Sequence, residues 1–152
     1  MLSELLSTDR VRVPLGSHSK ADLLRELVRL AVGDADENTV GGIFSAVEAR
    51  EAQVSTAMGG GLAVPHGRTD FVPEVRVAGG IVHDVPDYIA LDGSPVKVAF
   101  LVLTPVAASG QHVKLLSRIA RLMHNPESRE ALVASTSADD FMHVIHMAEA
   151  SS

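Results

Sequence analysis

The 152-residue sequence contains no cysteine, no tryptophan and a single tyrosine. Without cysteine the chain forms no disulfide, has no thiolate nucleophile and offers no sulfur ligand to a metal, which fits a reducing compartment. Its net charge of −6 and its 3% aromatic content argue against a nucleic-acid surface, which needs basic patches and aromatic side chains for stacking. We therefore expect protein partners and no nucleic-acid partner.

Long hydrophobic runs are also missing. The longest apolar segment, 98–106, includes Thr104 and Pro105 and is much shorter than the roughly 20 residues that cross a bilayer. The first six residues lack a basic region followed by an apolar run, so they do not resemble a signal peptide. We expect a soluble, cytoplasmic protein with no membrane insertion, in which residues 1–152 form one domain around a sizeable core.

Strand-like and helix-like periodicity alternate in blocks along the chain. Apolar spacing predicts strands at 11–15, 62–64, 75–82 and 96–103, and helices at 20–30, 40–51, 109–123, 127–133 and 138–147. Ser17 or Ser19 can cap the first helix, which should end near Gly33. Strand 96–103 is apolar almost throughout, as expected for a central strand covered on both faces. The fold class is therefore α/β, a three-layer α/β/α domain with a mixed central sheet flanked by helices on both faces.

A glycine-rich stretch, GGGLAVPHGR at 59–68, is the most informative part of the sequence. Gly59, Gly60 and Gly61 would let backbone N–H groups approach an anion, and Pro65 fixes the backbone just before His66. The stretch has neither the lysine of a phosphate loop nor the spacing of a dinucleotide-binding loop. It therefore predicts a histidine, placed at the end of a short strand, that itself handles a small anion.

Other residues are predicted to complete an anion site with His66. His112 lies in the first turn of its helix, on the apolar stripe that faces the body of the domain, where the helix N-terminus favours a phosphate. Arg50, at the end of an earlier helix, offers a guanidinium suited to a phosphoryl group, and Ser55 and Thr56 offer hydroxyls. A neutral imidazole is a good nucleophile near neutral pH because its ordinary pKa is about 6.5. Two histidines from distant segments would thus meet at one anion site.

These motifs resemble a known family. The residues that carry the resemblance are Arg50-Glu51, Val54-Ser55-Thr56, the glycine loop with Ala63-Val64-Pro65-His66-Gly67, and His112 within Gln111-His112-Val113-Lys114-Leu115-Leu116. Together they are similar to the fructose/mannitol-type enzyme IIA domains of the bacterial phosphoenolpyruvate-dependent phosphotransferase system, including its nitrogen-regulatory branch. The sequence departs from the usual pattern at Ala57, where the family has Gly, and at Gly60, where it has Asn.

The resemblance implies a phosphotransferase that needs no cofactor and no metal. His66 would accept a phosphoryl group from phospho-HPr and pass it to a IIB component for sugar uptake. His112 would orient that group and Arg50 would stabilise it. The predicted phosphoryl-binding residues are Ser55, Thr56, Gly59, Gly60 and Gly61.

Two alternatives stay open at this point. In the nitrogen-regulatory branch, the phosphorylation state of His66 would control binding to regulatory proteins. A metal-dependent hydrolase is the other class, since His143 and His146 have the i, i+3 spacing of helical ligands. No third ligand stands at a recognisable interval, so we expect no metal there.

Overall fold

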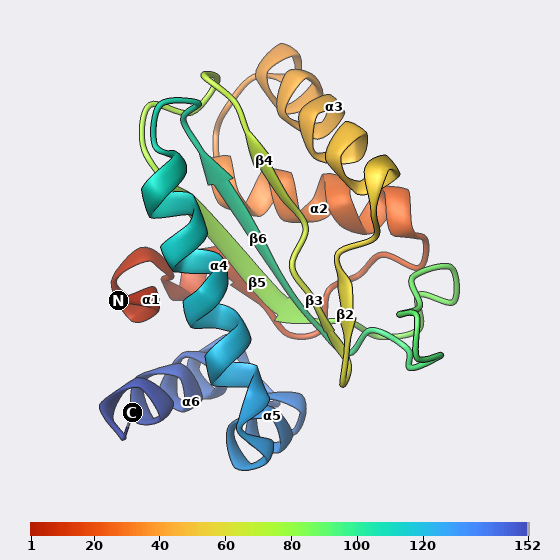
Figure 1. Cartoon of the computed structure of the whole chain (residues 1–152), viewed down its shortest axis with the longest axis vertical. Helices are drawn as coiled ribbons and strands as arrows, with labels where there is room; N and C mark the ends of the chain where they lie inside the picture. Colours follow the sequence, from red (N-terminus) through yellow and green to blue (C-terminus); the bar gives the residue numbers. More distant parts are fainter. Residues whose placement is uncertain (152) are drawn as a thin grey trace.

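A computed structural model describes residues 1–151 and shows a twisted sheet between two layers of helices (Figure 1). The helices are α1 (Leu2–Leu5), α2 (Lys20–Val32), α3 (Glu37–Gln53), α4 (Ser109–His124), α5 (Pro126–Val133) and α6 (Ala138–Ala150). The strands are β1 (Val11–Arg12), β2 (Ala57–Gly59), β3 (Leu62–Ala63), β4 (His66–Arg68), β5 (Arg76–Ile81) and β6 (Val98–Thr104), and a short 3-10 turn spans Thr8–Arg10.

The strands form one mixed sheet in the order β1-β5-β6-β3-β2, and β4 pairs with β6 beyond the end of β3. The β1/β5, β3/β6 and β4/β6 pairs are parallel, whereas β5/β6 and β2/β3 are antiparallel. All seven residues of β6 are buried. The predicted mixed sheet with an apolar central strand is therefore confirmed.

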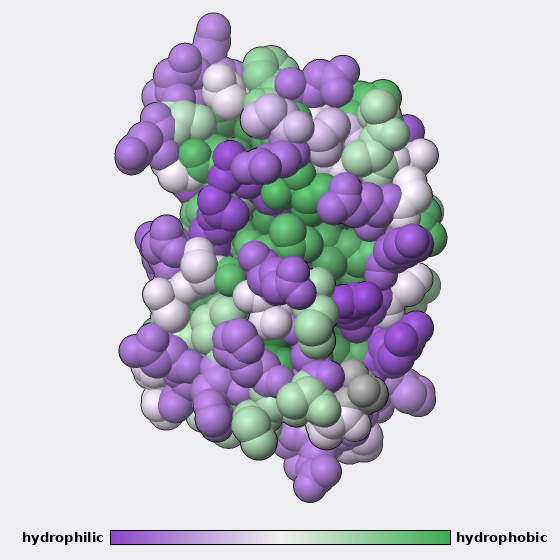
Figure 2. Space-filling model, turned by 90° about the vertical axis from the view of Figure 1, so that its left-hand side faces the viewer, coloured by the Kyte–Doolittle hydropathy of each residue, from purple (hydrophilic) through white to green (hydrophobic). Residues whose placement is uncertain are grey.

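The two faces of β6 contribute to two halves of the core. Leu101 and Leu103 pack with residues of α2 and α3, whereas Phe100 and Val102 pack with residues of α1, α4 and α6. This division follows from the two-residue period of a strand, whose successive side chains point to opposite faces. Seen from the left-hand side of the Figure 1 view, the surface is largely hydrophilic around a central hollow in which hydrophobic side chains remain visible (Figure 2). The predicted three-layer α/β/α architecture is confirmed.

Side-chain caps explain where the helices begin. Of the two serines considered for α2, Ser19 is the cap: its Oγ accepts a hydrogen bond from the Asp22 N–H at 3.2 Å. Ser137 caps α6 in the same way through the Asp140 N–H at 3.0 Å. Gly33, with φ of 61°, ends α2 as expected. Helix α6 runs to Ala150, one turn beyond the predicted end.

The glycine-rich stretch folds differently from the prediction. It includes two strands that periodicity did not indicate, β2 and β4, and His66 opens β4 instead of ending a strand. Gly59 ends β2, and Gly60 and Gly61 form the turn of the β2–β3 hairpin; their φ angles are 87°, 63° and 83° in sequence order. Consecutive positive φ angles are the reason glycine is needed here. Within residues 1–151, no helix is long and apolar enough to cross a membrane.

Candidate functional site

His66 is placed by the pairing of β4 with β6. It lies opposite Val102 in a parallel register, so its side chain leaves the same face of the sheet as Val102, toward α4. The ring is half-buried, and its Nδ1 lies 2.8 Å from the carbonyl oxygen of Val64. A carbonyl oxygen only accepts, so this contact assigns the proton of the neutral ring to Nδ1. The lone pair that can act as a nucleophile is therefore on Nε2.

His112 approaches His66 from the first turn of α4. It is 6% exposed, and its Nδ1 lies 2.8 Å from Oγ1 of Thr104, the last residue of β6. The two histidine rings have centroids 5.1 Å apart and are inclined by 66°. The structure thus brings together the two histidines that the sequence predicted to meet.

Both rings are biased toward the neutral form. Burial lowers the pKa of His66; the hydrogen bond to Val64 opposes this effect, and the positive charge of Arg50 adds to it. Burial also lowers the pKa of His112 to about 4, with further contributions from the nearby His66, Arg68 and Arg50. At neutral pH, both rings therefore keep a lone pair on one nitrogen.

A pocket of about 220 Å³ opens beside the His66 ring. It is lined by Arg50, Ser55, Thr56, Met58, Val64, His66 and Leu116. The Arg50 guanidinium, in the last turn of α3, donates to the carbonyl oxygen of Val54 at 3.0 Å. Oγ of Ser55 accepts the Ala57 N–H at 3.2 Å, which leaves the hydroxyl proton of Ser55 available to an anion. A neutral nucleophile, a guanidinium and a hydroxyl thus share one pocket.

Thr56 lines the pocket, but its hydroxyl is hydrogen-bonded to the side chains of Glu51 and Tyr88. This residue is buried, and its hydroxyl donates to the Glu51 carboxylate and lies 2.7 Å from the Tyr88 hydroxyl. Its N–H donates to the same carboxylate at 2.9 Å. In this arrangement, Thr56 orders the loop after α3 and its hydroxyl is not directed to a bound anion.

The three glycines are not part of the pocket. Leu62, at the end of their turn, pairs with Val98, whereas His66 pairs with Val102, four residues further along β6, so the turn is ~13 Å away at ~3.3 Å per residue. Gly59 and Gly60 lie instead against side chains of Asp92 and Arg129. The expectation that their N–H groups cradle the phosphoryl group is therefore corrected: none of the three glycines lines the pocket beside His66.

Some residues of the site were not foreseen from the sequence. The sequence indicates only that Thr104 belongs to the apolar segment 98–106, and Tyr88 and Lys20 give no signal of their own. Glu51 does give a signal in the sequence. It follows Val47 by four residues on the apolar stripe of α3, so a carboxylate stands at a position where a buried side chain is expected.

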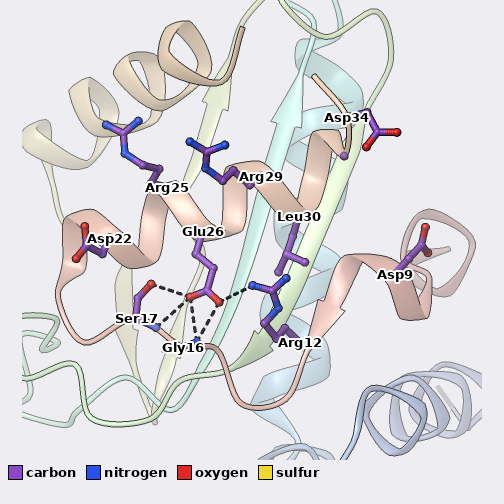
Figure 3. A pocket seen from close by; sticks show the side chains of 11 residues that line it. Asp9, Arg12, Gly16, Ser17, Asp22, Arg25, Glu26, Arg29, Leu30 and Asp34 are labelled. Atoms are coloured by element: carbon purple, nitrogen blue, oxygen red, sulfur yellow. Dashed lines mark hydrogen bonds and ion pairs between the residues drawn. The ribbon is translucent and has the colours of Figure 1, made fainter. Parts of the chain in front are cut away.

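A larger groove, of about 540 Å³, lies along α2 and β1 and contains none of the predicted site residues (Figure 3). Its side chains carry charges of both signs, and two of its arginines are paired with carboxylates. Arg12 donates to Glu26 at 2.9 Å, and Arg29 forms a two-pronged contact with Glu37 at 2.6 and 2.7 Å. In residues 1–151, no three His, Asp or Glu side chains gather as a metal-binding group, and His143 and His146 are exposed on α6.

Comparison with known proteins identifies relatives over nearly the whole chain. Residues 4–147 match the family described as "Phosphoenolpyruvate-dependent sugar phosphotransferase system, EIIA 2". The chain is 30% identical over 95% of its length to the PTS system fructose-specific EIIABC component of Bacillus subtilis, of which it spans only 23%. It is 32% identical to the nitrogen regulatory protein of Pseudomonas aeruginosa, covering 95% of this chain and 94% of that protein. A mannitol-specific phosphotransferase enzyme IIA component of Staphylococcus aureus is 31% identical, and the match covers 98% of this chain and 100% of that protein.

Solved structures show the same fold. The nitrogen regulatory protein IIA-Ntr from Neisseria meningitidis superposes with a TM-score of 0.79 at 29% identity, covering 95% of this chain and 98% of that one. Enzyme IIAMtl of Escherichia coli, in its complex with phosphorylated enzyme IIBMtl, superposes with a TM-score of 0.69 at 15% identity, covering 93% and 97%. The second comparison supports the fold alone.

Proposed function

Because the chain belongs to the EIIA type-2 family of the phosphoenolpyruvate-dependent sugar phosphotransferase system, we propose that it is a phosphocarrier in which His66 is the phosphorylated residue. The donor is the phosphohistidine of HPr, and the acceptor is a IIB component. The supporting observation is the His66 ring itself: its Nδ1–H is bonded to Val64, and within residues 1–151 its Nε2 has no hydrogen-bond partner.

The transfer forms one bond and breaks one. The Nε2 lone pair of His66 attacks phosphorus as the phosphorus–nitrogen bond to the donor histidine breaks, and that electron pair returns to the donor ring. His66 becomes positively polarised as it is phosphorylated, and its Nδ1–H, already bonded to the Val64 carbonyl, is stabilised by that contact. In transfer to the acceptor, a nucleophile of the acceptor attacks phosphorus as the bond to Nε2 of His66 breaks, and that electron pair returns to the His66 ring.

The protein contributes mainly charge and position to such a step. Negative charge is spread over three phosphoryl oxygens, so donors aimed at them stabilise the transition state. Arg50 and the Ser55 hydroxyl line the pocket beside His66, and the second ring nitrogen of His112 is a further polar group close to it. No metal is needed for this chemistry.

A regulatory role is the second candidate, and a specific observation favours it. The nitrogen regulatory relative matches this chain almost end to end at 32% identity, and the Neisseria meningitidis IIA-Ntr structure superposes at a TM-score of 0.79. In this role the phosphorylation state of His66 changes which proteins bind, because a doubly charged group appears on a half-buried ring.

One experiment tests whether the protein is a phosphocarrier and distinguishes a role in sugar uptake from a role in regulation. The protein is incubated with labelled phosphoenolpyruvate, enzyme I and HPr, and candidate IIB proteins are then added. Label on this chain supports the carrier, and its passage to a IIB supports sugar uptake. Label that stays on this chain after the IIB proteins are added supports regulation, provided that the binding of partner proteins depends on the phosphorylation. A chain that takes up no label from phospho-HPr rules out both.

A further inference from the structure

We propose that Glu51 is a positioning residue for phosphoryl transfer, acting on His66 through a chain of hydrogen bonds that runs from its carboxylate through Thr56 and Val64. The proposal rests on the proposed function, because it concerns the same histidine. Glu51 is a buried carboxylate that would contact neither the transferred phosphoryl group nor the His66 ring, so its effect on the transfer would be indirect.

Glu51 is the centre of a buried polar cluster. It is 7% exposed, and its carboxylate accepts the Thr56 N–H at 2.9 Å, the Thr56 hydroxyl and the Tyr88 hydroxyl at 3.2 Å. The ammonium of Lys20 lies 3.0 Å from the same carboxylate. Burial alone would raise the pKa of Glu51, but the contacts with Thr56 and Lys20 outweigh it and lower the pKa. The group is therefore a carboxylate held by donors from three directions.

Two further hydrogen bonds lead from Thr56 to the nucleophile. The Thr56 carbonyl accepts the Val64 N–H at 3.1 Å, which extends the β2–β3 pairing by one step. The Val64 carbonyl then accepts the Nδ1–H of His66 at 2.8 Å. Within Thr56 and within Val64, the N–H and the carbonyl are separated only by the φ and ψ angles of one residue. The adjoining β2–β3 pairing restrains these angles, so fixing the Thr56 amide at one end limits where the Val64 carbonyl can lie at the other.

The cluster is itself fixed by distant parts of the chain. Lys20 begins α2, and its ammonium sits 4.7 Å from the centre of the Tyr88 ring, while its N–H donates to Asp87 at 2.8 Å. Tyr88 is fully buried in the segment after β5. Throughout the described residues, no buried side-chain polar atom lacks a partner. A fully satisfied buried network has one low-energy arrangement, so it can hold the loop in a single geometry.

The consequence for His66 is a choice of tautomer. While the Val64 carbonyl stays in place, the proton is held on Nδ1 and the lone pair on Nε2, the nitrogen that attacks phosphorus. If the Thr56 loop relaxes, that carbonyl is free to move and the neutral ring can place its proton on either nitrogen. Part of the population would then present the wrong nitrogen, and the correct one would be less well aimed.

The test uses Glu51→Gln and two substitutions of Thr56. Glu51→Gln keeps the shape but loses the charge that pairs with Lys20. Thr56→Val removes only the hydroxyl and leaves the Glu51–Lys20 pair in place, and Thr56→Ser restores a hydroxyl. The matched control is Glu149→Gln, a second buried carboxylate that accepts the N–H groups of Leu2 and Ser3 at 2.8 Å on α6, away from the pocket.

Two readouts separate positioning from simple loss of stability. One is the rate of phosphoryl transfer from phospho-HPr, divided into a maximal rate and a KM. The other is the ¹⁵N spectrum of His66, which reports the tautomer without any partner. We expect Glu51→Gln and Thr56→Val to lower the maximal rate at least about tenfold with little change in KM. Both should also shift the His66 nitrogens toward a mixture of tautomers.

Thr56→Ser should recover most of the rate and the wild-type spectrum, and Glu149→Gln should change neither readout even where its melting temperature falls. The proposal is overturned if folded Thr56→Val and Glu51→Gln keep the wild-type tautomer and maximal rate. It is also overturned if Glu149→Gln reproduces their effects. If Glu51→Gln does not fold, the comparison of Thr56→Val with Thr56→Ser still tests the proposal. If wild-type protein takes up no phosphoryl group, the proposed function fails, while the ¹⁵N spectra still test the hydrogen-bond chain.

Discussion

The rings of His66 and His112 meet at 5.1 Å because β6 positions both of them. His66 lies opposite Val102 on one side of β6, and Thr104, two residues further along, faces the same way and bonds the His112 ring at 2.8 Å. The site therefore depends on the register between β4 and β6. A shift of one residue in that register would turn His66 to the opposite face of the sheet.

Removing the nucleophile should abolish phosphorylation. We expect His66→Ala to take up no label from phospho-HPr, since His66 supplies the imidazole that lines the pocket. His83→Ala, at an exposed position, is the control and should be labelled like wild type. Stoichiometric, acid-labile labelling of His66→Ala would show that another residue is the acceptor.

Substituting the second histidine should slow transfer without preventing it. His112→Ala keeps the nucleophile but loses the polar group beside it, so we expect a rate lower by about 10²-fold with residual labelling. Rapid-quench measurement of transfer from phospho-HPr checks this expectation. An undiminished rate in a folded variant would remove His112 from the mechanism.

Arg50 should affect both the pKa of His66 and the transfer rate. Its positive charge disfavours protonation of the ring, so Arg50→Gln should raise the pKa of His66, which an NMR titration measures. The same variant should lose roughly tenfold or more in transfer rate, because a donor to the phosphoryl oxygens is gone. If the pKa falls or does not change, the assigned charge effect is wrong.

Stability should fall as the pH is lowered below about 6.5. His112 has an ordinary pKa of 6.5 when unfolded and about 4 in the folded protein, so the unfolded state binds more protons between these values. In that window the free energy of unfolding decreases with falling pH, by at most about 1.4 kcal/mol per pH unit from this residue. The loss is complete near the folded pKa.

Urea unfolding of wild type and His112→Gln between about pH 5 and 7 measures this contribution, because Asp and Glu titrate mainly below that range. We expect a smaller slope in the variant. Equal slopes would mean that His112 is not held in its neutral form by the fold.

The sequence predicted the parts of the fold that have strong local signals. Helices α2 to α6 follow from apolar spacing, with a cap for α2 expected at Ser17 or Ser19, and β6 follows from an apolar run. Strands β2 and β4 are only three residues long and include glycine, so no alternation could mark them. Their existence is decided by pairing with β3 and β6, which is a tertiary effect.

The site was predictable in composition but not in detail. His66, His112, Arg50 and Ser55 do lie around one pocket or beside it, and their roles stay predictions. The glycine loop was misjudged because three adjacent glycines suit a hairpin turn as well as an anion cradle. Gly60 has φ of 63°, an angle that Asn, the usual family residue, also tolerates. The Glu51 cluster joins residues from three separate segments, which no local pattern can reveal.

The central position of β6 has a consequence for dynamics. This strand pairs with β5 on one side and with β3 and β4 on the other, and all its residues are buried. Its amides can exchange with solvent hydrogen only when much of the sheet opens, so they should be among the slowest-exchanging in the chain. Both rings thus belong to residues held directly against this strand, His66 by pairing with Val102 and His112 by its bond to Thr104, whereas Ser55 lies in an exposed loop. Binding partners would therefore meet an exposed edge around a floor that seldom opens.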